Sequence, residues 1–126
     1  MRAIDTNVLV RLITRDDAKQ VSAAESFIEK GAWVSQLALA ETIWVLDSVY
    51  GLDAKRLALA VEMLLNHAQL SLQDAEVIEL ALEGFRKRPA VSFTDHLMVG
   101  IARKNGHLPL GTFDRGLGGM EGALRL

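Results

Sequence analysis

The sequence contains no cysteine among its 126 residues, which excludes both a disulfide framework and a thiolate metal site. Proline is almost as scarce, and Pro89 and Pro109 both fall in short breaks between apolar patterns. Glu41, Asp47 and Glu62 interrupt the longest apolar stretches, so none approaches the roughly 18 residues of a membrane span. A basic tail is also missing and the formal net charge is −2, so composition alone does not indicate a nucleic-acid-binding protein.

The residues that are present suit a globular protein. Half of them are hydrophobic, and a chain of 126 residues buries about two-thirds of its unfolded surface as a single domain, here residues 1–126. The early Asp5 is incompatible with the apolar core of a secretory signal, so we expect a cytoplasmic protein without membrane contact.

Short apolar segments alternate with helical patterns along the chain. We predict strands over residues 2–4, 32–34, 70–72, 108–112 and 123–126. We predict helices over residues 6–13, 17–28, 36–50, 54–65, 75–88 and 95–104, the last five capped by Asp16, Ser35, Asp53, Asp74 and Thr94. This alternation predicts an α/β fold of three layers, with a short parallel sheet of four or five strands and helices on both faces. Ligands bind such folds at the carboxyl ends of the strands.

Four acidic residues stand where simple structural roles explain them poorly. Asp5 follows the first strand, Asp114 follows the strand that ends at Thr112, and Asp95 lies at the start of a helix. Glu41 lies within ALAETIWVL, a helix that is apolar on nearly all sides and is therefore predicted to be buried.

Each acid also has an ordinary structural interpretation, as a helix cap or a turn residue. Asp47 is a useful comparison, because it too follows apolar residues yet lies about 120° around the helix from Glu41. Several carboxylates in one cleft repel one another unless a cation neutralises them, and oxygen ligands favour Mg²⁺ or Mn²⁺. With the four acids assigned to a cation, the remaining charges change from −2 to +2, which is compatible with a polyanionic substrate.

Four motifs in order resemble those of PIN domains, and the layout is similar to the VapC-type toxins of bacterial toxin–antitoxin pairs. They are AIDTNVLVRL, LALAETIWVL, SFTDHLMVGIARKNG and LGTFDRGL, and they span essentially the whole chain. The resemblance implies a Mg²⁺-dependent endoribonuclease with an acidic site formed by Asp5, Glu41, Asp95 and Asp114. Asn7 and Thr112 match polar positions that support such a site.

The resemblance also implies partners. RNA is the expected substrate, a cognate antitoxin protein the expected inhibitor, and a homodimer the expected assembly. Candidate RNA contacts are Arg11, Arg15, Arg103, Lys104 and Arg115, each of which could equally be a solvated surface charge.

Two positions depart from the family pattern: Ser92 stands where many relatives carry a further acid, and His96 where a small residue is common.

Other functions remain open at this stage. A metal-free nuclease would need His67, His96 or His107 as a general base, and His96 is the strongest candidate because it follows Asp95. A phosphoryl-accepting domain fits poorly, because Asp5 has no acidic neighbour and no lysine follows Lys104. A dehalogenase-like phosphatase would need Asp in place of Asn7. The remaining alternatives are a PIN-fold binding partner without turnover and a PIN nuclease that processes RNA or cuts DNA outside toxin–antitoxin systems.

Overall fold

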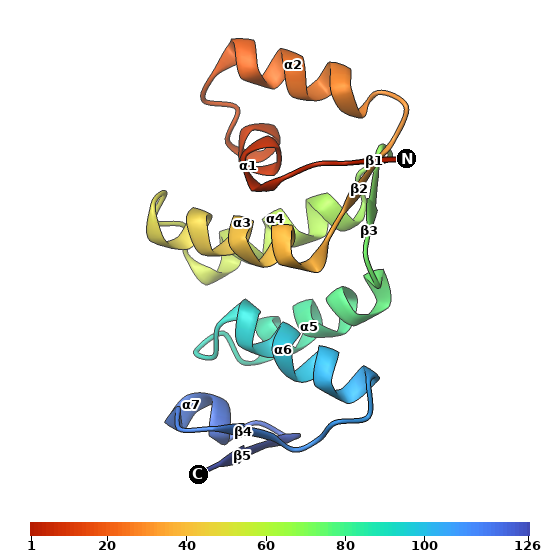
Figure 1. Ribbon diagram of the computed structural model, residues 1–126. Helices are drawn as coiled ribbons and strands as arrows, with labels where there is room; N and C mark the ends of the chain where they lie inside the picture. Colours follow the sequence, from red (N-terminus) through yellow and green to blue (C-terminus); the bar gives the residue numbers. More distant parts are fainter. The chain divides into compact units, whose positions relative to one another are not determined.

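The computed structural model describes all 126 residues, which form two compact units, Met1–Ala75 and Glu76–Leu126. Both units combine helices with short parallel strands, as Figure 1 shows. The predicted α/β class is therefore confirmed, with the five strands found as one sheet of three and one of two. The assignment of residues 1–126 to a single domain stays a prediction. No helix is long and apolar enough to cross a membrane.

The sheet of the first unit has the order β1-β2-β3, with all strands parallel. Its strands are β1 (Arg2–Ala3), β2 (Ala32–Val34) and β3 (Leu70–Leu72). Central β2 pairs Ala32 with Leu70 and Val34 with Leu72, and all four of these side chains are buried. The first strand is shorter than the predicted residues 2–4: β1 lies at the edge of this sheet with both of its residues exposed, and Ile4, which follows it, is buried.

Four helices surround this sheet: α1 (Thr6–Thr14), α2 (Ala18–Ile28), α3 (Gln36–Ser48) and α4 (Ala54–Leu65). Helix α1 packs against α2 and α3, α3 packs against α4, and α4 packs against β3 (Figure 1). Ser35 and Asp53 cap α3 and α4 as predicted. The cap of α2 is Asp17 rather than Asp16, whose carboxylate is bound instead by Thr14 and Tyr50.

The prediction that α3 is buried on all sides is also wrong. Its buried residues are Ala38, Leu39, Thr42, Ile43 and Leu46. On another face, Leu37 and Trp44 are 70% and 64% exposed, and Glu41 lies exposed between them. The helix is apolar on nearly all sides, but the elements packed against it cover only one stripe of that surface.

The second unit contains α5 (Ala75–Lys87), α6 (Phe93–Lys104), β4 (Leu110–Thr112), α7 (Arg115–Gly118) and β5 (Ala123–Arg125). Strands β4 and β5 are parallel, with Leu110 opposite Ala123, and the short helix α7 connects them. A buried cluster of Val91, Val99 and Leu117 joins α6 to α7.

Four details in this unit or directly before it differ from the predictions. Ser92, not Thr94, caps α6. Asp74 precedes α5 but has a left-handed backbone (φ 48°), instead of the extended conformation that the helix caps of this protein adopt. The fourth strand is shorter than predicted, beginning at Leu110, and the short helix α7 was not predicted.

Candidate acidic site

Asp5 is the N-cap of α1. Its backbone is extended (φ −97°, ψ −179°), and its Oδ1 accepts a hydrogen bond of 3.2 Å from the backbone N–H of Val8. This bond satisfies one of the four free N–H groups at the helix start. Asp5 therefore has a structural role, and its carboxylate is exposed where β1 leads into α1.

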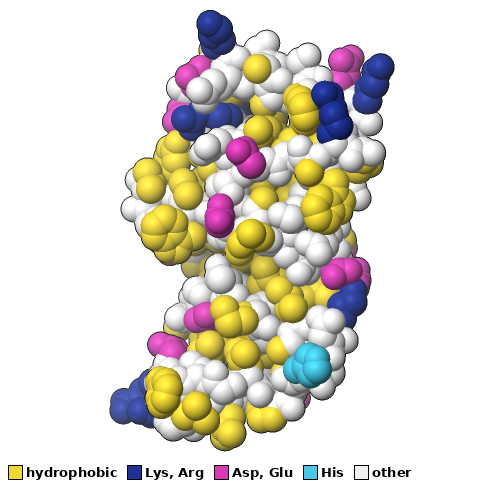
Figure 2. All heavy atoms as spheres, viewed as in Figure 1, with side chains coloured by type: hydrophobic (Ala, Val, Ile, Leu, Met, Phe, Trp, Pro, Cys, Tyr) yellow, Lys and Arg dark blue, Asp and Glu magenta, His cyan; other side chains and the backbone are white.

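Glu41 is connected to the start of α1 by the residue that follows Asp5. The hydroxyl of Thr6 donates a hydrogen bond of 2.7 Å to Oε2 of Glu41. A charge-assisted bond of this kind fixes the direction of a long flexible side chain. The first unit therefore brings two of the four predicted acids to the same junction of α1 and α3. Figure 2 shows acidic side chains among hydrophobic ones over this part of the unit.

Sequence reasoning missed Thr6 as a positioning residue. Thr6 is part of the DTN motif, but its role appears only in the structure, where it forms a hydrogen bond with a residue 35 positions further along the chain. Asn7, which was predicted to support the acids, lies with Arg11 and Phe27 in a hollow of about 320 Å³ between α1 and α2.

Asp95 lies in the first turn of α6, where it is the third helical residue and not the first as predicted. Its backbone N–H donates to Oγ of Ser92 over 3.1 Å. The N-terminal turn favours a negative charge because the helix dipole and free N–H groups are positive there. Ser92, which replaces an acid of the family pattern, thus serves as the helix cap. Its position three residues before Asp95 matches a capping-box pattern that could have identified it.

Asp114 is the N-cap of α7, and its Oδ2 accepts a hydrogen bond of 2.7 Å from the backbone N–H of Leu117. Its own N–H donates to Oγ1 of Thr112 over 3.0 Å. Thr112 therefore orients the turn that carries Asp114, and its role in supporting an acidic site stays a prediction. As predicted, Asp114 follows the carboxyl end of a strand.

The donor atoms of these residues suit a hard cation. In Asp5, Glu41 and Asp114 one carboxylate oxygen accepts a hydrogen bond from the protein, which leaves the second oxygen available. Oxygen donors of this type are the ligands that Mg²⁺ and Mn²⁺ prefer. Within either unit, however, no three His, Cys, Asp or Glu side chains are close enough together to hold a metal ion. A shared four-acid site therefore stays a prediction.

The basic residues proposed as RNA contacts mostly have partners. Arg11 donates to Gln20, Asp16 and Tyr50; the hydrogen bond with Tyr50 raises the pKa of Arg11, and the negative charge of Asp16 adds to this effect. In the same network, hydrogen bonds from Thr14 and then Tyr50 lower the pKa of Asp16. The network connects α1, α2 and the residues after α3, so Arg11 has a structural role.

Among the other basic candidates, Arg15 lies 3.5 Å from Glu25, and Lys104 lies 2.6 Å from Glu76. Arg103 donates to the backbone carbonyl of Glu121 over 3.4 Å. Arg115 is exposed in α7, directly after Asp114, and is the candidate best placed to meet substrate near an acid.

His96 was the histidine that a metal-free nuclease would use. The structure buries this residue, which is only 6% exposed. Its Nε2 lies 3.0 Å from the carbonyl oxygen of Arg88, and its ring lies against Gly84. A buried ring with a backbone partner has an ordinary packing role, and it is poorly placed to take a proton from water.

Parallel strands with acidic residues at their carboxyl ends define an α/β protein with a candidate metal-dependent site. Residues 3–121 match the family model of the PIN domain, and the chain belongs to this family. PIN domains are generally nucleases and typically use divalent metal ions. No curated protein and no solved structure was found to match the chain.

Proposed function

We propose that this protein is a Mg²⁺-dependent endoribonuclease whose site consists of Asp5, Glu41, Asp95 and Asp114. The observation that carries the proposal is the PIN family match over residues 3–121, which includes all four acids. The hydrogen bond from Thr6 to Glu41 supports it, because it holds one acid beside the segment that carries another.

The proposed reaction is hydrolysis of an RNA phosphodiester bond. The carboxylates of Asp5, Glu41, Asp95 and Asp114 would hold the cation. Bound there, Mg²⁺ or Mn²⁺ would lower the pKa of water and stabilise the charge on the phosphate. Thr6 and Thr112 position Glu41 and Asp114, and Arg115 is available to bind the RNA backbone.

The test is cleavage of total cellular RNA by purified protein in Mg²⁺ and in EDTA. We expect cleavage in Mg²⁺, none in EDTA, and recovery when Mn²⁺ replaces Mg²⁺. Cleavage that persists in EDTA would contradict the metal requirement. Activity on single-stranded DNA under the same conditions distinguishes a DNA-directed PIN nuclease.

We further propose that the nuclease is the toxin of a type II toxin–antitoxin pair and forms a homodimer. The exposed Leu37 and Trp44 of α3 and Leu59 of α4 offer apolar surface for a protein partner. Induction in a bacterial host should arrest growth, whereas Asp5→Asn should not. Continued growth on induction of an active enzyme would favour an RNA-processing role, and sedimentation of the purified protein tests the dimer.

A binding protein without turnover is the alternative, and one observation favours it. Asp5 and Asp114 both act as helix caps, so a structural role explains the presence of each carboxylate without a catalytic one. Absence of cleavage of any RNA in Mg²⁺ or Mn²⁺, with RNA binding retained, would support this alternative.

A further inference from the structure

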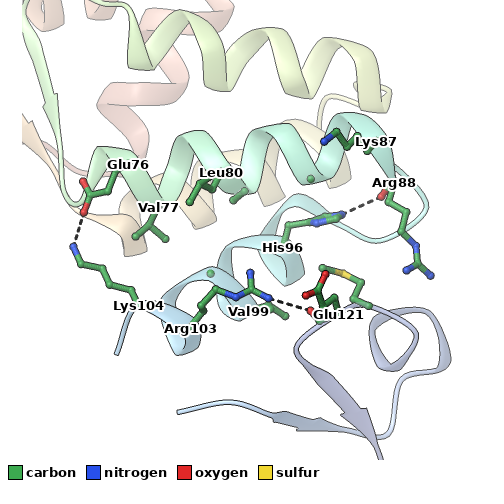
Figure 3. A pocket seen from close by; sticks show the side chains of 14 residues that line it. Glu76, Val77, Leu80, Lys87, Arg88, His96, Val99, Arg103, Lys104 and Glu121 are labelled. Carbon is green, nitrogen blue, oxygen red and sulfur yellow. Dashed lines mark hydrogen bonds and ion pairs between the residues drawn. The ribbon is translucent and has the colours of Figure 1, made fainter. Parts of the chain in front are cut away.

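A second cavity lies within the residues 76–126 unit, and the proposed reaction does not use it. It is a groove of about 600 Å³ between α5, α6 and the segment around Met120 and Glu121, as Figure 3 shows. Its apolar lining comes from residues that the two helices contribute at helical spacing: Val77, Leu80, Ala81, Gly84, Val99 and Gly100. We call this cavity the α5–α6 groove.

Charged residues surround the apolar lining. Lys87, Arg88, Arg103 and Lys104 face two acidic residues, Glu76 and Glu121, which gives an excess of two positive charges. Lys104 is paired with Glu76 across one end of the groove, and Lys87 is paired with Glu83 on the surface. With Lys87 and Lys104 each paired to a glutamate, the charges that remain are those of Arg88 and Arg103 against Glu121, an excess of one positive charge.

These two guanidinium groups are held by backbone carbonyls and not by carboxylates. Arg88 donates to the carbonyl of Gly119 over 3.0 Å, and Arg103 donates to that of Glu121 over 3.4 Å. A carbonyl orients a guanidinium group without neutralising it, so both remain able to bind an anionic group.

We propose that the α5–α6 groove binds an acidic segment of a partner protein, with large apolar side chains in the groove and carboxylates at the two arginines. The length of the groove fits a short peptide segment. The stretch of α5 from Val77 to Lys87 extends for about 15 Å, which matches about five residues of extended chain. Leu80 on the rim is 66% exposed, and a chain lying along α5 would cover it.

The groove is connected to both acids of this unit. His96, which lines it, is the neighbour of Asp95 in the first turn of α6. Arg88 binds the carbonyl of Gly119, which follows the single turn of α7 that Asp114 caps. A peptide that moves Arg88 or His96 would therefore displace the backbone that carries the two carboxylates. Since this consequence rests on the proposed nuclease function, the first test measures binding alone.

Binding is tested by fluorescence anisotropy with the full-length protein and a labelled synthetic peptide in which two Leu and one Phe alternate with Asp and Glu. The matched probe carries Lys in place of every acid. We expect the acidic peptide to bind at least about tenfold more tightly. The proposal is contradicted if the two peptides bind equally well. It is also contradicted if the acidic peptide shows no binding at concentrations up to about 100 μM.

Two variants locate the site, each with a matched control. Leu80→Glu and Arg103→Glu should each weaken binding of the acidic peptide by about tenfold or more. Met63→Glu and Arg56→Glu place the same changes on exposed positions of α4, and they should leave binding within about twofold. Unchanged binding in both groove variants would overturn the assignment of the groove.

Other occupants give different results. If decanoate binds this groove and the acidic peptide does not, the site takes a small amphiphilic anion and the proposal is wrong. If Leu80→Glu converts a dimer to a monomer in sedimentation, the groove is an interface between two copies, which also contradicts it. Peptide binding by a wild-type protein that cleaves no RNA would leave the groove supported and the nuclease function refuted.

Discussion

The two units carry their acidic residues in different ways. In the first unit, Asp5 and Glu41 belong to different helices, and the Thr6 hydroxyl connects the start of α1 to Glu41. In the second unit, Asp95 and Asp114 stand at the starts of separate helices, each beside a hydroxyl that bonds its backbone N–H. A helix start positions Asp5 and both acids of the second unit, whereas Glu41 lies within a helix and is held by the Thr6 side chain.

Asp5 and Asp114 show that the same residue can be both a helix cap and a candidate metal ligand. A carboxylate has two oxygens, and capping a helix occupies only one of them. Substitution by asparagine separates the two roles, because asparagine caps a helix about as well as aspartate but carries no charge.

The largest effect is expected for Asp5→Asn. We predict that RNA cleavage falls by about 100-fold or more, because a charged metal ligand is lost. The free energy of unfolding should change by less than about 0.5 kcal/mol, since the cap is kept. Rates of RNA cleavage and urea denaturation measure the two quantities. Asp53→Asn, at the cap of α4, is the matched control and should change neither one.

A smaller loss of activity is expected when the connection within the first unit is broken. Thr6→Val removes the hydroxyl bound to Glu41, and we predict a decrease in cleavage of about tenfold. Thr6→Ser keeps the hydroxyl and should retain most of the activity. If valine and serine give the same rate, the hydrogen bond has no role in positioning Glu41.

The helix patterns and most of the fold were predictable from the sequence. Apolar spacing located α4, and the placement of Ser35 and Asp53 identified two caps. Burial of α3 was not predictable in the same way, because a helix that is apolar on all sides does not reveal which face its neighbours cover. The exposure of Leu37 and Trp44 depends on packing between elements that the sequence does not encode locally.

The sequence names candidate residues for the site but does not reveal their contacts. The four motifs identify the acids, and the family match over residues 3–121 confirms the class of protein. The roles of Thr6 and Ser92 depend on hydrogen bonds that appear only in the structure. Whether the acids of both units bind one cation stays a prediction.

In the second unit, Gly84→Ala tests the packing beneath Asp95. A Cβ atom at this position would lie 2.9 Å from Nδ1 of His96, so the buried ring would have to move. We predict a decrease of about 1–3 kcal/mol in the free energy of unfolding, although alanine favours a helix. Gly100→Ala is the control, because its Cβ would lie 3.2 Å from a methyl group of Val77 and 3.9 Å from the backbone oxygen of the same residue, both longer than the contact at Gly84. Equal effects in thermal or urea denaturation would contradict this account of His96.

The smallest effect concerns pH and the network at Asp16. Its pKa is lowered in the folded protein by Thr14 and then Tyr50, so its contribution to stability is present above about pH 4. That contribution is lost as the pH falls through the lowered pKa. The stability difference between wild type and Asp16→Asn should therefore shrink in acid. A carboxyl titration by NMR that shows an ordinary pKa for Asp16 would contradict this.

Mn²⁺ binding, measured by calorimetry, tests the central claim most directly, namely that acids from both units share a cation. If the acids share one cation, Asp5→Asn and Asp95→Asn should each abolish binding of the same Mn²⁺ ion. The double variant should then bind Mn²⁺ no more weakly than either single variant. If the acids act separately, the two substitutions have independent, additive effects or none. Additive effects, or unchanged Mn²⁺ binding, would contradict the claim.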